Sequence, residues 1–149
     1  MVSILGKKTI IFTGVFVVIS AAYLLLPIIS NSTDDDELSV IDNSAIVSIE
    51  LPDELSKVAQ IGKLAFQSNC LACHGENAVG QKGVAPPLIH KIYEPSHHGD
   101  ESFQRAISVG VRAHHWKFGN MPAIEGLTRG DVKAIIAYVR ELQAANGIF

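Results

Sequence analysis

Two cysteines and a histidine in Cys70-Leu71-Ala72-Cys73-His74 are the residues whose types and spacing are most specific for one kind of chemistry. Two thiols one helical turn apart can add to the two vinyl groups of a haem and form two thioethers, and the next histidine can donate a ring nitrogen to the iron. The motif therefore predicts one covalently attached haem c, with Cys70 and Cys73 as attachment points and His74 as an iron ligand.

Three other roles are open to these cysteines. A redox-active dithiol requires a strand–turn–helix context, and the sequence has no alternating strand and helix pattern. A simple disulfide is allowed in an oxidising compartment. A zinc site would need two more ligands, which histidines elsewhere in the chain could supply; these are His97, His98, His114 and His115.

The segments around the motif predict an all-α domain with long loops. An apolar stripe begins at Pro52, with Asp53 and Glu54 in its first turn, and runs into Cys70. Residues 75–99 are rich in glycine and proline and predict loop. Residues 100–109 predict a short helix ended by Gly110. The stripe of the first helix is formed by Leu55, Val58, Gly62, Leu64, Ala65 and Phe66.

The last helix has the clearest pattern. Thr128 is a natural N-cap, with Asp131 three residues later, and Gly147 is expected to end the helix. Apolar residues follow helical spacing between these positions. They are Val132, Ile135, Ile136, Val139 and Leu142.

Residues 10–29 form an uncharged apolar run, long enough to cross a bilayer at about 1.5 Å per residue. Lys7 and Lys8 precede it, so residues 1–9 are predicted to be cytoplasmic and the rest of the chain to be exported. Residues 30–51 form an acidic tether whose stretch 45–51 can lie on the domain, and residues 52–149 form the domain. A cleavable signal peptide is the alternative, with Ser30-Asn31-Ser32 as its processing site.

Charge and cysteine content exclude several classes of protein. The formal net charge is −3, and residues 51–149 carry ten basic and nine acidic side chains. This balance excludes a basic nucleic-acid binder. Two cysteines in 149 residues are too few for a disulfide-stapled miniprotein.

From about residue 53 to residue 147 the chain resembles a small class I cytochrome c, of the bacterial, membrane-anchored, monohaem kind. The segment Gly62-Lys63-Leu64-Ala65-Phe66 resembles the family's first helix, whose glycine lets it cross the last helix closely, here opposite Ile135 and Tyr138. The segment Ala85-Pro86-Pro87-Leu88 resembles the loop whose proline carbonyl accepts a hydrogen bond from the iron-ligating histidine. Pro86 follows His74 by twelve residues.

The resemblance implies further haem contacts. Asn120-Met121-Pro122 resembles the distal loop, so Met121 is expected to be the sixth iron ligand. A methionine more commonly fills a core, but Met1 is the only other one in the chain. Trp116 or Arg112 is expected to donate a hydrogen bond to a haem propionate. The alternative for Trp116 is packing against the haem edge.

A six-coordinate haem predicts an electron carrier rather than an enzyme. The resemblance implies a location on the bacterial inner membrane, with the haem domain in the periplasm, and redox partners such as a quinol–cytochrome c reductase and a terminal oxidase. The alternatives are a subunit of a larger oxidase or reductase, a haem sensor, and a metal-handling module. The last would use His97, His98, His114 and His115 to bind copper or zinc. One of these histidines could instead replace Met121 as an iron ligand, although surface histidines in loops are the plainer explanation.

Overall fold

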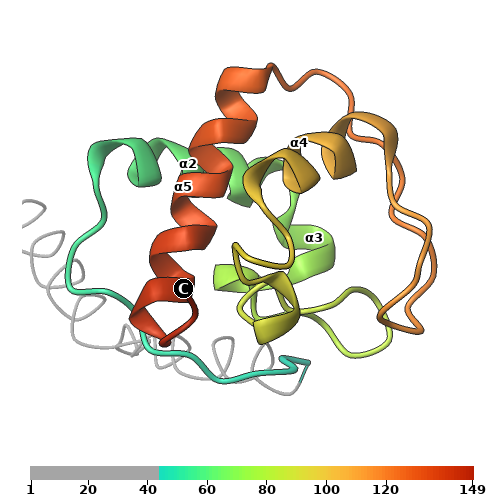
Figure 1. Cartoon of the computed structure of the whole chain (residues 1–149), viewed down its shortest axis with the longest axis horizontal. Coiled ribbons are helices and arrows are strands. Elements are labelled where there is room, and N and C mark those ends of the chain that lie inside the picture. The colour runs from blue at the N-terminus through green and yellow to red at the C-terminus, as the bar shows by residue number, and fades with distance from the viewer. Residues whose placement is uncertain (1–43) are drawn as a thin grey trace, which may run out of the picture. The chain divides into compact units, whose positions relative to one another are not determined.

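Three helices that cross one another form the core of the computed structural model, which describes residues 44–149. The helix α2 (Lys57–Asn69) crosses α5 (Arg129–Ala145), and α4 (Asp100–Val109) packs against α5. The one-turn helix α3 (Leu71–His74) follows α2 and carries the end of the cysteine motif (Figure 1). Within the described residues the only β pairings are isolated bridges. The helical cytochrome c-like domain expected from the sequence is therefore observed.

The close crossing of α2 and α5 depends on Gly62. A Cβ atom at this position would lie 1.8 Å from the carbonyl oxygen of Ala134 and 3.0 Å from the amide nitrogen of Ile135. The predicted close approach is present, and Ile135 faces Gly62 as predicted, but the other facing residue is Ala134 and not Tyr138. Tyr138 instead packs its ring edge-on against Phe66, with centroids 5.7 Å apart.

The helices α4 and α5 agree with the sequence prediction at nearly every point. The helix α4 begins and ends at the predicted residues, and Gly110 is its C-cap. The helix α5 begins with the predicted capping box between Thr128 and Asp131, and its apolar stripe is buried. Gly147 closes the helix as predicted: it follows the C-cap Asn146 with a φ of +71°, and the amides of Gly147 and Ile148 donate to the carbonyls of Ala144 and Gln143.

The beginning of α2 was predicted wrongly. The helix starts at Lys57, and the hydroxyl of Ser56 accepts a hydrogen bond from the amide of Ala59. Asp53 and Glu54 therefore precede the helix and do not lie in its first turn. Ser56 is the better cap because its side chain satisfies one of the amides that a helix start leaves unpaired.

The apolar stripe of α2 is narrower than predicted. Phe66 and Gly62 are buried as expected, whereas Val58 is 49% and Leu64 is 66% exposed. Ala59, which the pattern did not include, is fully buried. A small residue beside Gly62 lets the backbones of α2 and α5 approach closely, which a valine or leucine facing α5 would prevent.

Residues 44–51 lie along the domain outside any helix, and Ala45 forms an isolated bridge with Gln81. The amides of Ile46 and Val47 donate to the carbonyl of Val79, and the side chain of Asn146 forms two hydrogen bonds with the backbone of Glu50. The expectation that residues 45–51 lie on the domain is confirmed. Within residues 44–149, no helix combines the length and the apolar character that crossing a bilayer requires. The predicted anchor at residues 10–29 lies outside the described residues.

Two short 3-10 helices interrupt the long loop between α3 and α4. The first, η1, spans Glu76–Ala78, and the second, η2, spans Lys91–Tyr93. Gln143 of α5 is fully buried beneath this loop, and its amide donates to the carbonyl oxygens of Leu88 and Tyr93. The hydrogen bonds of this buried side chain therefore attach the loop to α5.

Candidate functional site

A largely apolar cavity of about 570 Å³ opens between α3, α4 and the loop 110–122. Its volume lies within the range of about 300–1,000 Å³ that small-molecule and cofactor pockets usually have. Every site residue predicted from the sequence lines this cavity. These residues are Cys70, Cys73, His74, Pro86, Arg112, Trp116 and Met121.

The cysteine motif faces the cavity because a helical turn begins at Cys70. The amides of Cys73 and His74 donate to the carbonyl of Cys70, so the motif forms a single turn. Both cysteines are free thiols, the first half-buried and the second exposed. Burial and the neighbouring Cys73 raise the pKa of the Cys70 thiol to about 11.

This raised pKa disfavours the dithiol alternative. Redox-active Cys-x-x-Cys pairs hold a thiol pKa below the ordinary value, so that the nucleophilic thiolate is populated at neutral pH. The pKa of Cys70, about 11, is shifted in the opposite direction, so its thiolate is scarcely populated at neutral pH. The simple disulfide is not formed, since both cysteines are free. The mixed zinc site is also not assembled: the potential metal-ligand cluster that the described residues form contains histidines but no cysteine.

The ring of His74 is fixed in the orientation that metal ligation requires. Its Nδ1 lies 2.9 Å from the carbonyl oxygen of Pro86, the hydrogen bond expected from the loop resemblance. A carbonyl oxygen only accepts, so Nδ1 carries the proton and Nε2 keeps its lone pair. Burial lowers the pKa of His74, and the bond to Pro86 opposes this change. The neutral imidazole is therefore favoured.

The loop that carries Met121 is closed by backbone pairing. The amide of Val111 donates to the carbonyl of Met121, and the amide of Met121 donates back, both at 2.9 Å. Gly110 makes this pairing possible, because a Cβ there would lie 2.6 Å from the carbonyl oxygen of Met121. Met121 is half-buried and lines the same cavity as His74.

Trp116 supplies the strongest sign that a polar ligand group belongs in the cavity. Its indole Nε1 is buried and has no hydrogen-bond partner within residues 44–149. A buried donor left unpaired costs about 1–3 kcal/mol. The ring is held in place by stacking on Phe118 and by an edge contact with His90. The donor therefore fits an acceptor that the polypeptide does not supply, such as a carboxylate.

Comparison with known proteins agrees with this site. Residues 59–143 match the family model described as cytochrome c. The chain belongs to the cytochrome c family. The cofactor of this family is covalently bound haem c, and the cavity, the free thiols and the unpaired indole donor fit that group. Residues 70, 73, 74 and 121 are the ones that could hold it.

The curated relatives are larger proteins. The chain is 38% identical over 94 residues to the cbb3-type cytochrome c oxidase subunit FixP of Bradyrhizobium sp. (strain ORS 278), covering 62% of this chain and 30% of that protein. It is 30% identical over 99 residues to the subunit CcoP of Cereibacter sphaeroides, covering 65% and 32%. A FixP of Bradyrhizobium diazoefficiens is 34% identical over 110 residues, covering 72% and 35%. The chain thus spans about a third of these relatives.

Three polar residues that line this cavity or support its wall were not expected from the sequence. Tyr93 and Arg105 line it. Burial raises the pKa of the Tyr93 hydroxyl, and the approach of the Trp116 side chain, which does not reach hydrogen-bond geometry, opposes this rise, so the phenol stays neutral at physiological pH. Arg140 donates to the carbonyl oxygens of Tyr93 and His98 and so positions the loop that carries both. No local pattern marks Tyr93 or Arg140, because their partners lie far away along the chain.

Proposed function

We propose that this chain carries single electrons through one haem c attached at Cys70 and Cys73 and ligated by His74 and Met121. The observation that carries the proposal is that all four residues line one apolar cavity. When bound, the haem supplies an iron that cycles between the ferric and ferrous states by one electron.

The protein side chains determine how that electron is exchanged. His74 and Met121 would both ligate the iron and leave it no free position for oxygen or another substrate, so that electrons would be exchanged without a substrate binding to the iron. Methionine as the second axial ligand raises the reduction potential relative to a second histidine. The apolar lining favours the less charged ferrous state and excludes water from the iron.

Three other residues act on the cofactor in this proposal. Pro86 holds the tautomer and the ring plane of His74, which strengthens its ligation. The unpaired Nε1 of Trp116 donates to one haem propionate. Arg112, which is exposed at the mouth of the cavity, pairs with a propionate as well.

The setting of the electron transfer follows from the sequence. The proposed domains are a cytoplasmic N-terminus (1–9), a transmembrane anchor (10–29), a tether (30–51) and the haem domain (52–149). The haem domain then lies in the periplasm of a bacterium, where tethering raises its effective concentration near membrane partners. A quinol–cytochrome c reductase would donate electrons, and a terminal oxidase would accept them.

A second candidate function is that of a subunit within an oxidase complex. The similarity to cbb3-type oxidase subunits favours it. Purification from membranes in mild detergent separates the two: an exchanging carrier elutes by itself, whereas a subunit elutes with the oxidase at constant stoichiometry.

The test of the electron-carrier proposal is a spectroelectrochemical titration of the haem-loaded protein, followed by exposure of the ferrous form to carbon monoxide. We expect reversible one-electron behaviour and no spectral change with carbon monoxide. A ferrous protein that binds carbon monoxide readily would have an open axial position, and a haem sensor or enzyme would then replace the carrier.

A further inference from the structure

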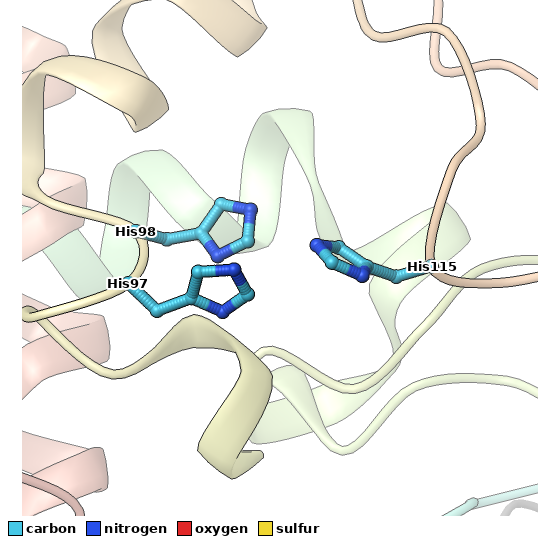
Figure 2. Close-up of side chains that lie close together, drawn as sticks. All are labelled: His97, His98 and His115. Atoms are coloured by element: carbon cyan, nitrogen blue, oxygen red, sulfur yellow. The ribbon is translucent and has the colours of Figure 1, made fainter.

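Four histidines from two separate loops meet at the rim of the cavity, although 15 residues lie between His98 and His114 in the sequence. His97 and His98 lie in the loop between η2 and α4, and His114 and His115 lie in the loop that leads to Met121. The rings of His97 and His98 each lie 5.2 Å from the ring of His115, centroid to centroid. Figure 2 shows His97 and His98 facing His115 across the gap between the loops.

Hydrogen bonds hold both loops in place. The amides of His97 and His98 donate to the carbonyl of Glu94 at 3.0 and 2.8 Å, and Arg140 donates to the carbonyl of His98. On the other side, the amide of Ala113 donates to the side chain of Asn120 at 2.9 Å. A site built on anchored loops loses little conformational entropy when it binds a ligand.

The ring of His98 is oriented as metal-binding imidazoles are. Its Nδ1 lies 2.6 Å from the carbonyl oxygen of Ile92, so Nδ1 carries the proton and Nε2 has a lone pair available. A backbone carbonyl that fixes the tautomer in this way is the usual outer partner of a metal-ligating histidine. His114 has the same arrangement, with Nδ1 at 2.9 Å from the carbonyl oxygen of Arg112.

The distances suit one small ion. One ring nitrogen from each of His97, His98 and His115 lies within 4.8 Å of the other two. Imidazole nitrogens bind first-row metals at about 2.0 Å, which places two tetrahedral ligands about 3.3 Å apart. The ring nitrogens must therefore approach one another by no more than about 1.5 Å, a movement that side-chain rotation can supply. His97 and His115 are exposed, so such rotation meets little resistance.

We propose that His97, His98 and His115 form a binding site for a divalent copper ion at the rim of the haem cavity. An all-imidazole ligand set suits copper, zinc and nickel, and among divalent first-row ions copper binds most tightly to a given nitrogen site. The described cluster contains no carboxylate, which disfavours magnesium, calcium and manganese. Its three ligands are residues other than His74 and Met121, although His98 and His115 line the same cavity, and the site does not depend on the electron-transfer role of the haem.

The proposal is tested by calorimetric titration of the ferric, haem-loaded protein with copper(II) chloride, with frozen-solution electron paramagnetic resonance of the loaded sample. We expect one tight site per chain and a copper signal with nitrogen hyperfine structure. The double variant His97→Ala/His115→Ala removes two exposed ligands and should lower the affinity by at least about 100-fold, more than the loss of an outer-sphere partner causes. The haem absorption spectrum monitors the fold of every sample.

The matched control is His90→Gln. His90 is the remaining histidine outside the cluster and the haem motif, and its Nδ1 accepts from the amide of Ile92. Glutamine removes the imidazole and keeps a polar side chain of similar size. This variant should bind copper as the unmodified protein does. Equal affinity in the double variant, an equal loss in His90→Gln, or several weak sites in place of one would overturn the proposal. Displacement of the copper by an equal concentration of zinc chloride would overturn the assignment to copper.

Discussion

Replacing Gly62 by alanine tests the helix crossing that supports the haem cavity. The added Cβ would lie 1.8 Å from the carbonyl oxygen of Ala134, and real Cβ atoms essentially never approach closer than 3.0 Å, so the backbones must separate by at least 1.2 Å. The obstacle is backbone, so no rotamer change relieves it. Phe66 and Tyr138, whose rings pack across the same crossing, would lose contact as the helices separate.

Two opposing effects determine the size of the change. Alanine is better than glycine inside a helix by about 1 kcal/mol. Overpacking of a close-packed interior costs about 1–3 kcal/mol, and a clash with a carbonyl belongs at the upper end. We therefore expect Gly62→Ala to lower the free energy of unfolding by about 2 kcal/mol, which lowers Tm by about 10 °C in a domain of this size.

Denaturant unfolding of the haem-loaded protein, followed by circular dichroism, measures this effect. The matched control is Gly130→Ala in α5, where a Cβ would meet only the Thr128 hydroxyl oxygen at 3.5 Å, an ordinary contact. That variant should be unchanged or slightly more stable. If Gly62→Ala were as stable as Gly130→Ala, the close crossing of α2 and α5 would be refuted.

Three further substitutions test the site and the fold. Met121→Ala should remove the sixth iron ligand, so the weak near-infrared band of methionine-ligated ferric haem should disappear and the reduction potential should fall. The ferrous form should then bind carbon monoxide, and retention of the near-infrared band would exclude Met121 as the ligand. Trp116→Phe removes the unpaired indole donor, so the pKa of the haem propionate that it contacts should rise. A plot of reduction potential against pH should then show its inflection at higher pH, and an unchanged inflection would contradict the contact. Hydrogen bonds from Thr128 lower the pKa of Asp131, so its contribution to stability is present above the unfolded-state pKa and is lost as pH falls through the folded-state pKa. Asp131→Asn should therefore lower Tm at pH 7, and the difference from the unmodified protein should shrink steadily as the pH falls below the unfolded-state pKa of aspartate. A difference that stays constant over this pH range would count against the capping box.

Features coded by neighbouring residues were predictable from the sequence. The helices α4 and α5 combine helical spacing of apolar residues with recognisable caps, so their bounds were predicted nearly to the residue. The haem motif and the bond between His74 and Pro86 depend on local spacing and a loop of known length.

Features that depend on distant partners were not predictable in the same way. The cap of α2 is Ser56, whose hydroxyl and amide also donate to the carboxylate of Glu141 in α5. The two residues are too far apart in the sequence for a local pattern to indicate this interaction. Val58 and Leu64 fit the apolar pattern but face outward, because the crossing point requires small residues. Gln143 is a polar residue in the core, and only the folded loop supplies its partners. The four rim histidines were visible as two pairs, but their meeting is a property of the fold.

Covalent attachment of haem at Cys70 and Cys73 is the central claim, and intact-mass spectrometry of the acid-denatured protein tests it most directly. The account predicts a mass greater than that of the polypeptide by one haem, with both thiols resistant to alkylation and a peptide containing residues 70–74 that carries the porphyrin. A polypeptide mass without haem, with both cysteines alkylated, would contradict the account.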